Sequence, residues 1–150
     1  GDGIGESLRN AGLSRKETRK KVEALLKDCG LPTEYADRYP HQVSGGQCQR
    51  AAIARALAIE PRLLICDEIT SALDVTVQKE ILELLNTLRT QRGHDLSILF
   101  ICHDISLVQQ FCDRVLVMYH GKIVEQGTPD AVIRNPQNDY TKRLIDSVLS

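Results

Sequence analysis

Hydrophobic positions in the first third of the chain recur at helical spacing. An amphipathic pattern begins after Ser14, which forms a capping box with Glu17, and Gly30 and Pro32 follow its last apolar position. A second helical stretch, rich in alanine, ends before Pro61. We therefore expect two helices here, joined by a loop.

Two short apolar runs further along the chain have the character of buried strands. They are LLIC at 63–66 and SILFIC at 97–102, and an uninterrupted apolar run is typical of a strand covered on both faces. Between them, a long amphipathic helix is expected from about Val75, and Gly93 marks its end. Its inward face would carry Ile81, Leu84, Leu85 and Leu88. Strand, helix and strand in this order predict a crossover unit with parallel strands.

The last third of the chain predicts a hairpin followed by two helices. Two strand-like runs flank His120 and Gly121, a dipeptide suited to a tight turn. Thr128 then caps a helix that has Pro129 at its first position, and a final helix occupies the tail.

Composition narrows the class of protein. The chain has 150 residues, of which 42% are hydrophobic and 26% charged, enough for the core of one globular domain. Its net charge is -1, so no overall basic field argues for a nucleic-acid partner. Its apolar stretches are shorter than the roughly 20 residues that span a bilayer, and its first residues lack the pattern of a secretory leader. We expect a chain that could dock on a membrane protein without entering the bilayer.

The five cysteines are scattered and form no CxxC pair: Cys29, Cys48, Cys66, Cys102 and Cys112. An odd, scattered set indicates reduced, buried thiols in a cytosolic protein, and it argues against a disulfide framework or a zinc site. Cys48 could be redox-sensitive, but we favour the interpretation that it is a small residue on a helix face.

Polar side chains that could do chemistry follow the two central strands. Asp67 and Glu68 end the first run, and His103 and Asp104 end the second. Ligands of parallel sheets gather at the carboxyl ends of the strands, where one carboxylate could bind Mg2+ and its neighbour could act as a base. Taken singly, these residues are more typical of a solvated strand end and a hydrogen-bonded structural histidine.

A Ser-Gly-Gly turn leads into the second helix. The N-terminal amides and the dipole of that helix favour an anion, and Gly45 and Gly46 lack a Cβ that would keep the backbone away from it. Alone, the turn that begins with Ser44 could be no more than a helix cap. Its coincidence with strand-end carboxylates and a histidine in one α/β frame favours a functional, anion-binding site over a helix cap alone.

In combination, these segments resemble a known family. VSGGQCQR resembles the signature motif of ATP-binding-cassette (ABC) ATPases, LLICDEITSALD resembles their Walker B strand and D-loop, and ICHD resembles their switch-histidine segment. YPHQVSGGQ, SALDVTVQKEILELL, DRVLVMYHGKIVEQG and NPQNDYTKRL together resemble the ATPase subunits of oligopeptide, dipeptide and nickel importers. Val43, Ile69, Asn138 and Asp139 depart from the commoner residues of that subfamily without removing a catalytic group.

The resemblance implies an α/β fold, the three-layer sandwich of the P-loop NTPase type. The phosphate loop GxxxxGK[ST], or Walker A, does not occur in the sequence, so we expect a truncated ABC ATPase domain. Residues 1–60, approximately, would form the end of the helical subdomain and the signature helix. Residues 61–128 would form the C-terminal part of the parallel core sheet with Walker B, D-loop and switch histidine, and 129–150 the C-terminal helices.

The family gives a role to each matching residue. Asp67 would help to hold Mg2+, usually through water, Glu68 would act as general base, and His103 would contact the γ-phosphate. Asp74 would link the two half-sites of a dimer. The contact to an ATP held by the partner subunit would come from the signature residues Ser44, Gly45, Gly46 and Gln47.

By the same resemblance, the intact protein would hydrolyse ATP to drive import of peptides or nickel. Its partners would be a second ABC ATPase subunit, identical or related, and transmembrane permease subunits, with the protein peripheral to the cytoplasmic face of the membrane. The fragment alone should be inactive, because it lacks the phosphate loop. Two alternatives stay open: a non-catalytic interaction or regulatory module that retains the motifs, and a DNA-maintenance ABC-type ATPase, although no coiled-coil arm or DNA-facing basic surface accompanies it here.

Overall fold

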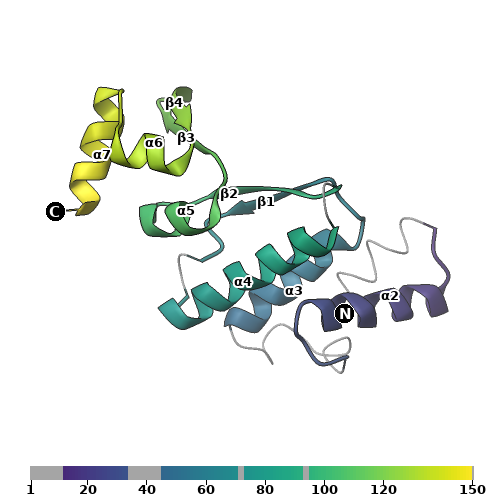
Figure 1. Cartoon of the computed structure of the whole chain (residues 1–150). Helices are drawn as coiled ribbons and strands as arrows, with labels where there is room; N and C mark the ends of the chain where they lie inside the picture. Colours follow the sequence, from purple (N-terminus) through teal and green to yellow (C-terminus); the bar gives the residue numbers. More distant parts are fainter. Residues whose placement is uncertain (1–11, 34–44, 71–72, 93–94, 150) are drawn as a thin grey trace. The chain divides into compact units, whose positions relative to one another are not determined.

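The computed structural model describes residues 12–33, 45–70, 73–92 and 95–149, which divide into two compact units between Leu99 and Phe100 (Figure 1). The first unit holds the helices α2 (Arg15–Asp28), α3 (Gly45–Leu57) and α4 (Val75–Arg92) and the strand β1 (Leu63–Asp67). The second holds α5 (Ile105–Phe111), β3 (Val115–Tyr119), β4 (Lys122–Gly127), α6 (Pro129–Arg134) and α7 (Asp139–Leu149). The strand β2 (Ser97–Ile101) begins in the first unit and ends in the second.

The predicted capping box opens α2. The Ser14 hydroxyl accepts a hydrogen bond from the Glu17 amide at 3.3 Å, and the Glu17 carboxylate accepts one from the Ser14 amide at 3.0 Å. Both bonds satisfy amides that a helix start leaves unpaired. Gly30 ends the helix with φ at +71°, a conformation that glycine adopts without strain.

The core of the first unit lies between its helices. The apolar face of α4 supplies Ile81, Leu85 and Leu88, all under 5% exposed, and this confirms the predicted inward face. The helix α3 packs between α2 and α4 (Figure 1). Its contribution to the core is Ile53, Ala54 and Leu57.

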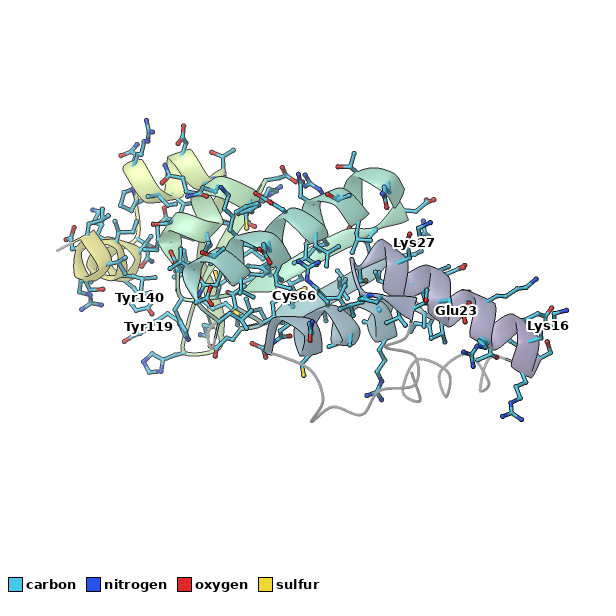
Figure 2. The ribbon with its side chains drawn as sticks, turned by 90° about the horizontal axis from the view of Figure 1, so that it is seen from below. Lys16, Glu23, Lys27, Cys66, Tyr119 and Tyr140 are labelled. Atoms are coloured by element: carbon cyan, nitrogen blue, oxygen red, sulfur yellow. The ribbon has the colours of Figure 1, made fainter. Side chains whose placement is uncertain are left out.

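The strands β1 and β2 form a parallel two-stranded sheet, joined through α4 as the sequence predicts. Along β1, burial alternates: Leu64 and Cys66 are buried, whereas Leu63 and Ile65 are 52% and 58% exposed. The prediction that this strand is covered on both faces is therefore wrong, because the helices of its unit cover one face only. The same prediction is wrong for β2, in which Leu99 and Ile101 are 41% and 44% exposed. Figure 2 shows Cys66 in the interior of the first unit.

The predicted hairpin is confirmed in the second unit. The strands β3 and β4 pair antiparallel around His120 and Gly121, whose φ values of +48° and +76° give the left-handed pair that a tight hairpin turn needs. Thr128 then caps α6, accepting a hydrogen bond from the Ala131 amide at 3.2 Å. The predicted start of this helix is therefore confirmed.

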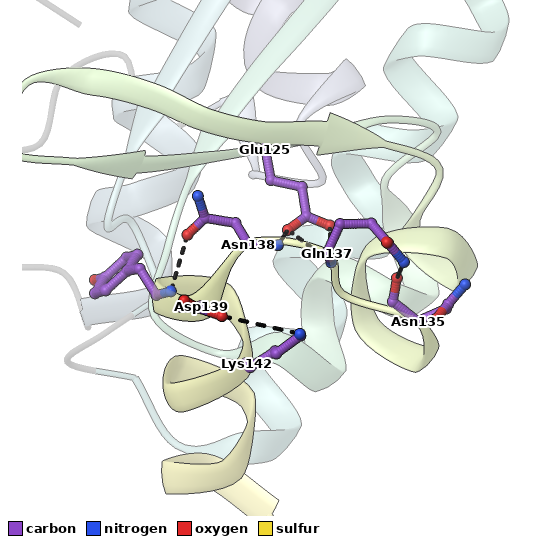
Figure 3. A network of polar contacts seen from close by, with 7 residues as sticks. Glu125, Asn135, Gln137, Asn138, Asp139 and Lys142 are labelled. Carbon is purple, nitrogen blue, oxygen red and sulfur yellow. Dashed lines mark hydrogen bonds and ion pairs between the residues drawn. The ribbon is translucent and has the colours of Figure 1, made fainter.

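A carboxylate in β4 accepts hydrogen bonds from the backbone just before α7 (Figure 3). Glu125 accepts hydrogen bonds from the Asn138 amide at 2.8 Å and the Gln137 amide at 3.0 Å, and these bonds hold its pKa below the ordinary value. Asn138 in turn accepts a bond from the Tyr140 amide at 2.8 Å. The Tyr140 ring stacks on Tyr119 of β3, with ring centroids 4.1 Å apart (Figure 2). Two separate contacts therefore join the hairpin to α7.

The cysteines confirm one part of the prediction and contradict another. All five are thiols, and Cys29 and Cys66 are buried. Burial raises the pKa of the Cys66 thiol to about 11, so this thiol stays protonated at neutral pH. Cys48 is exposed, and Cys102 and Cys112 are half-buried, so the prediction of buried thiols is wrong for these three. Cys48 lies on a helix that turns this position to the surface.

Candidate functional site

The signature residues lie at the start of α3. Gly45, Gly46 and Gln47 form its first turn, and Ser44 lies outside the described residues. This turn carries no acidic side chain, so the helix dipole is not offset by a carboxylate of its own. The arrangement suits an anion from outside the helix.

Gly46 is needed for packing as well as for any ligand. A Cβ built at this position would lie 2.7 Å from Cγ1 of Val77, in the first turn of α4. Val77 is β-branched and stiff at χ1, so it has little freedom to move away. The glycine therefore lets the start of α3 approach the start of α4.

The two predicted strand-end carboxylates lie where the sequence places them. Asp67 is the last residue of β1, Glu68 follows it, and both are exposed. The backbone of Glu68 is left-handed, with φ at +51°. Such a conformation costs a non-glycine residue roughly 1–3 kcal/mol, and strain of this kind gathers at functional sites.

Asp74 caps α4. Its carboxylate accepts a hydrogen bond from the Val77 amide at 2.9 Å, which satisfies one of the amides that the helix start leaves unpaired. Because Val77 also contacts Gly46, the structure brings two of the predicted site residues together at one end of the α3–α4 pair. This capping role of Asp74 was not foreseen from the sequence.

Sequence reasoning also missed Gln78, in the first turns of α4. Its side-chain amide donates to the backbone carbonyls of Thr70 at 2.8 Å and Leu73 at 3.1 Å. Both residues lie in the segment that connects β1 to α4. In the sequence, the only indication of this contact is that Gln78 follows the helix-capping Asp74 by four residues, and this spacing is weak evidence for it.

His103 belongs to the second unit. It is exposed and lies between β2 and α5, next to Asp104, which caps α5 by accepting bonds from the Ser106 and Leu107 amides at 2.8 and 3.3 Å. The cap fixes where α5 begins and so fixes the backbone directly after the histidine.

The carboxylates suit Mg2+ only in a site shared with other ligands. Across the described ranges, no three His, Cys, Asp or Glu side chains are grouped so that they could hold a metal ion. Mg2+ is usually bound through one or two carboxylates completed by phosphate oxygens and water. Asp67, exposed at the end of β1, fits the role of such a single carboxylate ligand.

These features first define a class of protein. A parallel β1–α4–β2 crossover, carboxylates at the end of β1 and a glycine-led helix start are the α/β arrangement of the P-loop NTPase type. In the part of the chain that the structure describes, no helix combines the length and the hydrophobicity that a membrane crossing requires.

Comparison with known proteins then gives the family. The family model described as ABC transporter matches residues 4–71. The oligopeptide transport ATP-binding protein OppF of Salmonella typhimurium is 49% identical over 99% of this chain and 44% of its own length. The dipeptide transport ATP-binding protein DppF of Haemophilus influenzae is 46% identical over 92% of this chain and 42% of its own length.

A solved structure supports the same assignment. The structure of cbiO1 from Clostridium perfringens, described as part of the ABC transporter complex cbiONQ, matches with a TM-score of 0.75 and 35% identity, over 97% of this chain and 54% of that chain. The chain belongs to the ABC ATPases. OppF and DppF are named as ATP-binding proteins of oligopeptide and dipeptide transport. The chain spans less than half the length of the curated relatives it matches.

Proposed function

We propose that this chain is part of an ATPase subunit that drives import of oligopeptides or dipeptides. By the intact subunit we mean the gene product that contains these residues together with a phosphate-loop half. The observation that carries the proposal is Asp67 and the strained Glu68 at the end of β1, in a chain 49% identical to an oligopeptide transport ATP-binding protein. The names of the relatives favour peptides over nickel as the solute.

In this proposal, the two carboxylates divide the work. Glu68 accepts the proton of the water that attacks the γ-phosphate, and Asp67 helps to hold Mg2+, which would neutralise charge on the phosphate oxygens. The water oxygen forms the new bond to phosphorus while the bond to ADP breaks. Phosphoryl transfer depends mainly on such positioning and charge stabilisation. His103 contacts the γ-phosphate and orients the reacting groups.

The signature turn serves a nucleotide held by a second ATPase subunit. Ser44 and the backbone of Gly45, Gly46 and Gln47 face the γ-phosphate across the dimer, where the amides and dipole of α3 favour negative charge. Asp74 links the two half-sites. The intact subunit would work at the cytoplasmic face of the membrane, docked on transmembrane permease subunits, and the chain without a phosphate loop would have no ATPase activity of its own.

The test is the substitution Glu68→Gln in the intact subunit. It keeps the shape of the side chain and removes the base, so we expect ATP turnover to fall by about 100-fold or more, within the range of a lost general base. ATP binding, measured by equilibrium dialysis, should be retained.

Glu60→Gln is the matched control. Glu60 also has a left-handed backbone, with φ at +52°, but its carboxylate pairs with Lys21 at 2.9 Å on the surface. Its substitution should leave turnover unchanged. Equal turnover of the parent and the Glu68→Gln variant would remove Glu68 from the role of base. A parent that binds ATP without hydrolysing it would favour the non-catalytic module.

A further inference from the structure

We propose that Gln78 is a positioning residue that fixes the segment after β1 to the start of α4 and so sets the place of Asp74 and the signature turn. The proposal rests on the function proposed above, because it concerns the same site.

The side-chain amide of Gln78 bridges two backbone carbonyls. Gln78 is half-buried, and its Nε2 donates to two backbone carbonyls, at 2.8 Å to Thr70 and 3.1 Å to Leu73. Nε2 of glutamine carries two hydrogens, so both of its donors are used. Thr70 is 3% exposed, so one end of this bridge is deep in the unit.

Those two carbonyls belong to residues that adjoin the proposed site. Thr70 lies two residues after Glu68, and Leu73 lies directly before Asp74. The Leu73 amide also donates to the Thr70 carbonyl, at 3.2 Å. Gln78 therefore ties the chain just after the proposed base to the chain just before the proposed dimer contact.

The start of α4 also contacts the first turn of α3, which carries the signature residues. Asp74 is bonded to the Val77 amide at 2.9 Å, and the Val77 side chain lies where a Cβ on Gly46 would be 2.7 Å away. A displaced start of α4 would therefore move Asp74 and press on Gly46. One side-chain amide thus holds a continuous set of contacts from the end of β1 to the start of α3.

We expect substitution of Gln78 to affect catalysis more than folding. Glu68 and the phosphate-binding groups do not depend on Gln78 for their chemistry, but catalysis is sensitive to displacements of about 1 Å, which can cost about 100-fold. Gln78→Met keeps the length of the side chain and loses both donors. We expect it to lower kcat of the intact subunit by about 10- to 100-fold with little change in KM.

The matched control is Gln91→Met. Gln91 is the same residue type on the same helix, it is exposed, and it lies near the other end of α4. It should leave kcat unchanged. Unfolding midpoints of both variants, measured in urea, separate loss of position from loss of fold, and Gln78→Leu serves as a second variant without donors should the methionine variant fold poorly.

ATP-dependent dimer formation distinguishes a positioning role from a purely structural one, because a purely structural contact would not affect it. In a Glu68→Gln background, where hydrolysis is blocked, ATP should produce dimers that size-exclusion chromatography detects. Adding Gln78→Met should raise the ATP concentration needed by about tenfold or more at equal ATP occupancy, and adding Gln91→Met should not. Dimerisation at the same ATP concentration in both double variants would overturn the inference.

Failure of the proposed function gives a different pattern. If the parent neither hydrolyses ATP nor dimerises with it, hydrogen exchange of the Leu73 and Asp74 amides still tests the anchor. Faster exchange in Gln78→Met than in Gln91→Met supports the positioning role, and equal exchange refutes it.

Discussion

Arg50 provides the sharpest stability prediction, because its guanidinium joins three helices. From α3, Nη1 donates to the Cys29 carbonyl at the end of α2 at 3.0 Å, and Nη2 lies 3.4 Å from a Glu80 carboxylate oxygen on α4. The Arg50 side chain is 21% exposed and that of Glu80 is 52% exposed. The two contacts therefore lie in different surroundings and should differ in their contribution.

The bond to the carbonyl dominates the expected loss. A hydrogen bond that involves a charged group contributes about 1.5–3 kcal/mol when it is partly shielded from water. The ion pair with the more exposed Glu80 contributes at most about 1 kcal/mol. Arg50→Met keeps the apolar stem of the side chain and removes both contacts. We expect it to lower the free energy of unfolding by about 2–3 kcal/mol, whereas Glu80→Gln should cost under about 1 kcal/mol.

Urea unfolding of the chain, followed by circular dichroism at a helix band, measures both losses. Arg55→Met is the matched control, because Arg55 lies in the last turn of the same helix and is exposed. It should cost under about 1 kcal/mol, the usual size of a charge–dipole contact at a helix end. The reasoning is refuted if Arg50→Met stays within about 0.5 kcal/mol of this control, or if Glu80→Gln costs as much as Arg50→Met.

Three further predictions follow from single contacts. Gly46→Ala should destabilise by about 1–3 kcal/mol because its Cβ would meet Val77 at 2.7 Å, and Val77→Ala in the same chain should restore part of the loss in urea unfolding. Thr18→Val should stabilise by about 1 kcal/mol, since the Thr18 hydroxyl is buried and finds no hydrogen-bond partner among the described residues; an unchanged urea midpoint would contradict this. The lowered pKa of Glu125 stabilises the fold above the pKa of the unfolded chain, and this stabilisation is lost as the pH falls through the folded value. Unfolding measured from pH 6 to pH 3 should therefore show a weaker acid loss in Glu125→Gln than in the parent.

Local signals in the sequence were enough to place most elements. The capping box of Ser14 and Glu17, the turn at His120 and Gly121 and the cap at Thr128 each depend on residues within a few positions of one another. Each is therefore readable without knowledge of the tertiary fold. The boundaries proposed near residues 60 and 128 stay predictions.

Contacts between distant segments could not be read in the same way. The one-sided burial of β1 depends on which helices cover it, and a run such as LLIC is equally apolar whether one face or both are covered. The bridge from Gln78 to the Thr70 and Leu73 carbonyls, and the approach of Gly46 to Val77, depend on how α3, α4 and the end of β1 pack. The sequence indicates which side chains are suited to binding or catalysis, whereas the packing of helices and strands determines which of them lie in contact.

Substitutions in the first turn of α4 and in its middle should have different effects. Its middle carries Ile81, Leu85 and Leu88, whose burial stabilises the first unit. Its first turn carries Val77 and Gln78, which contact Gly46 and the chain after Glu68. Truncating a buried residue of the middle, such as Leu85→Ala, costs about 2–5 kcal/mol and should lower the amount of folded subunit while leaving kcat per folded molecule intact. Substitution in the first turn should lower kcat per folded molecule and leave the amount of folded subunit unchanged. Measuring kcat and the amount of folded subunit for substitutions along α4 locates the boundary between its first turn and its middle.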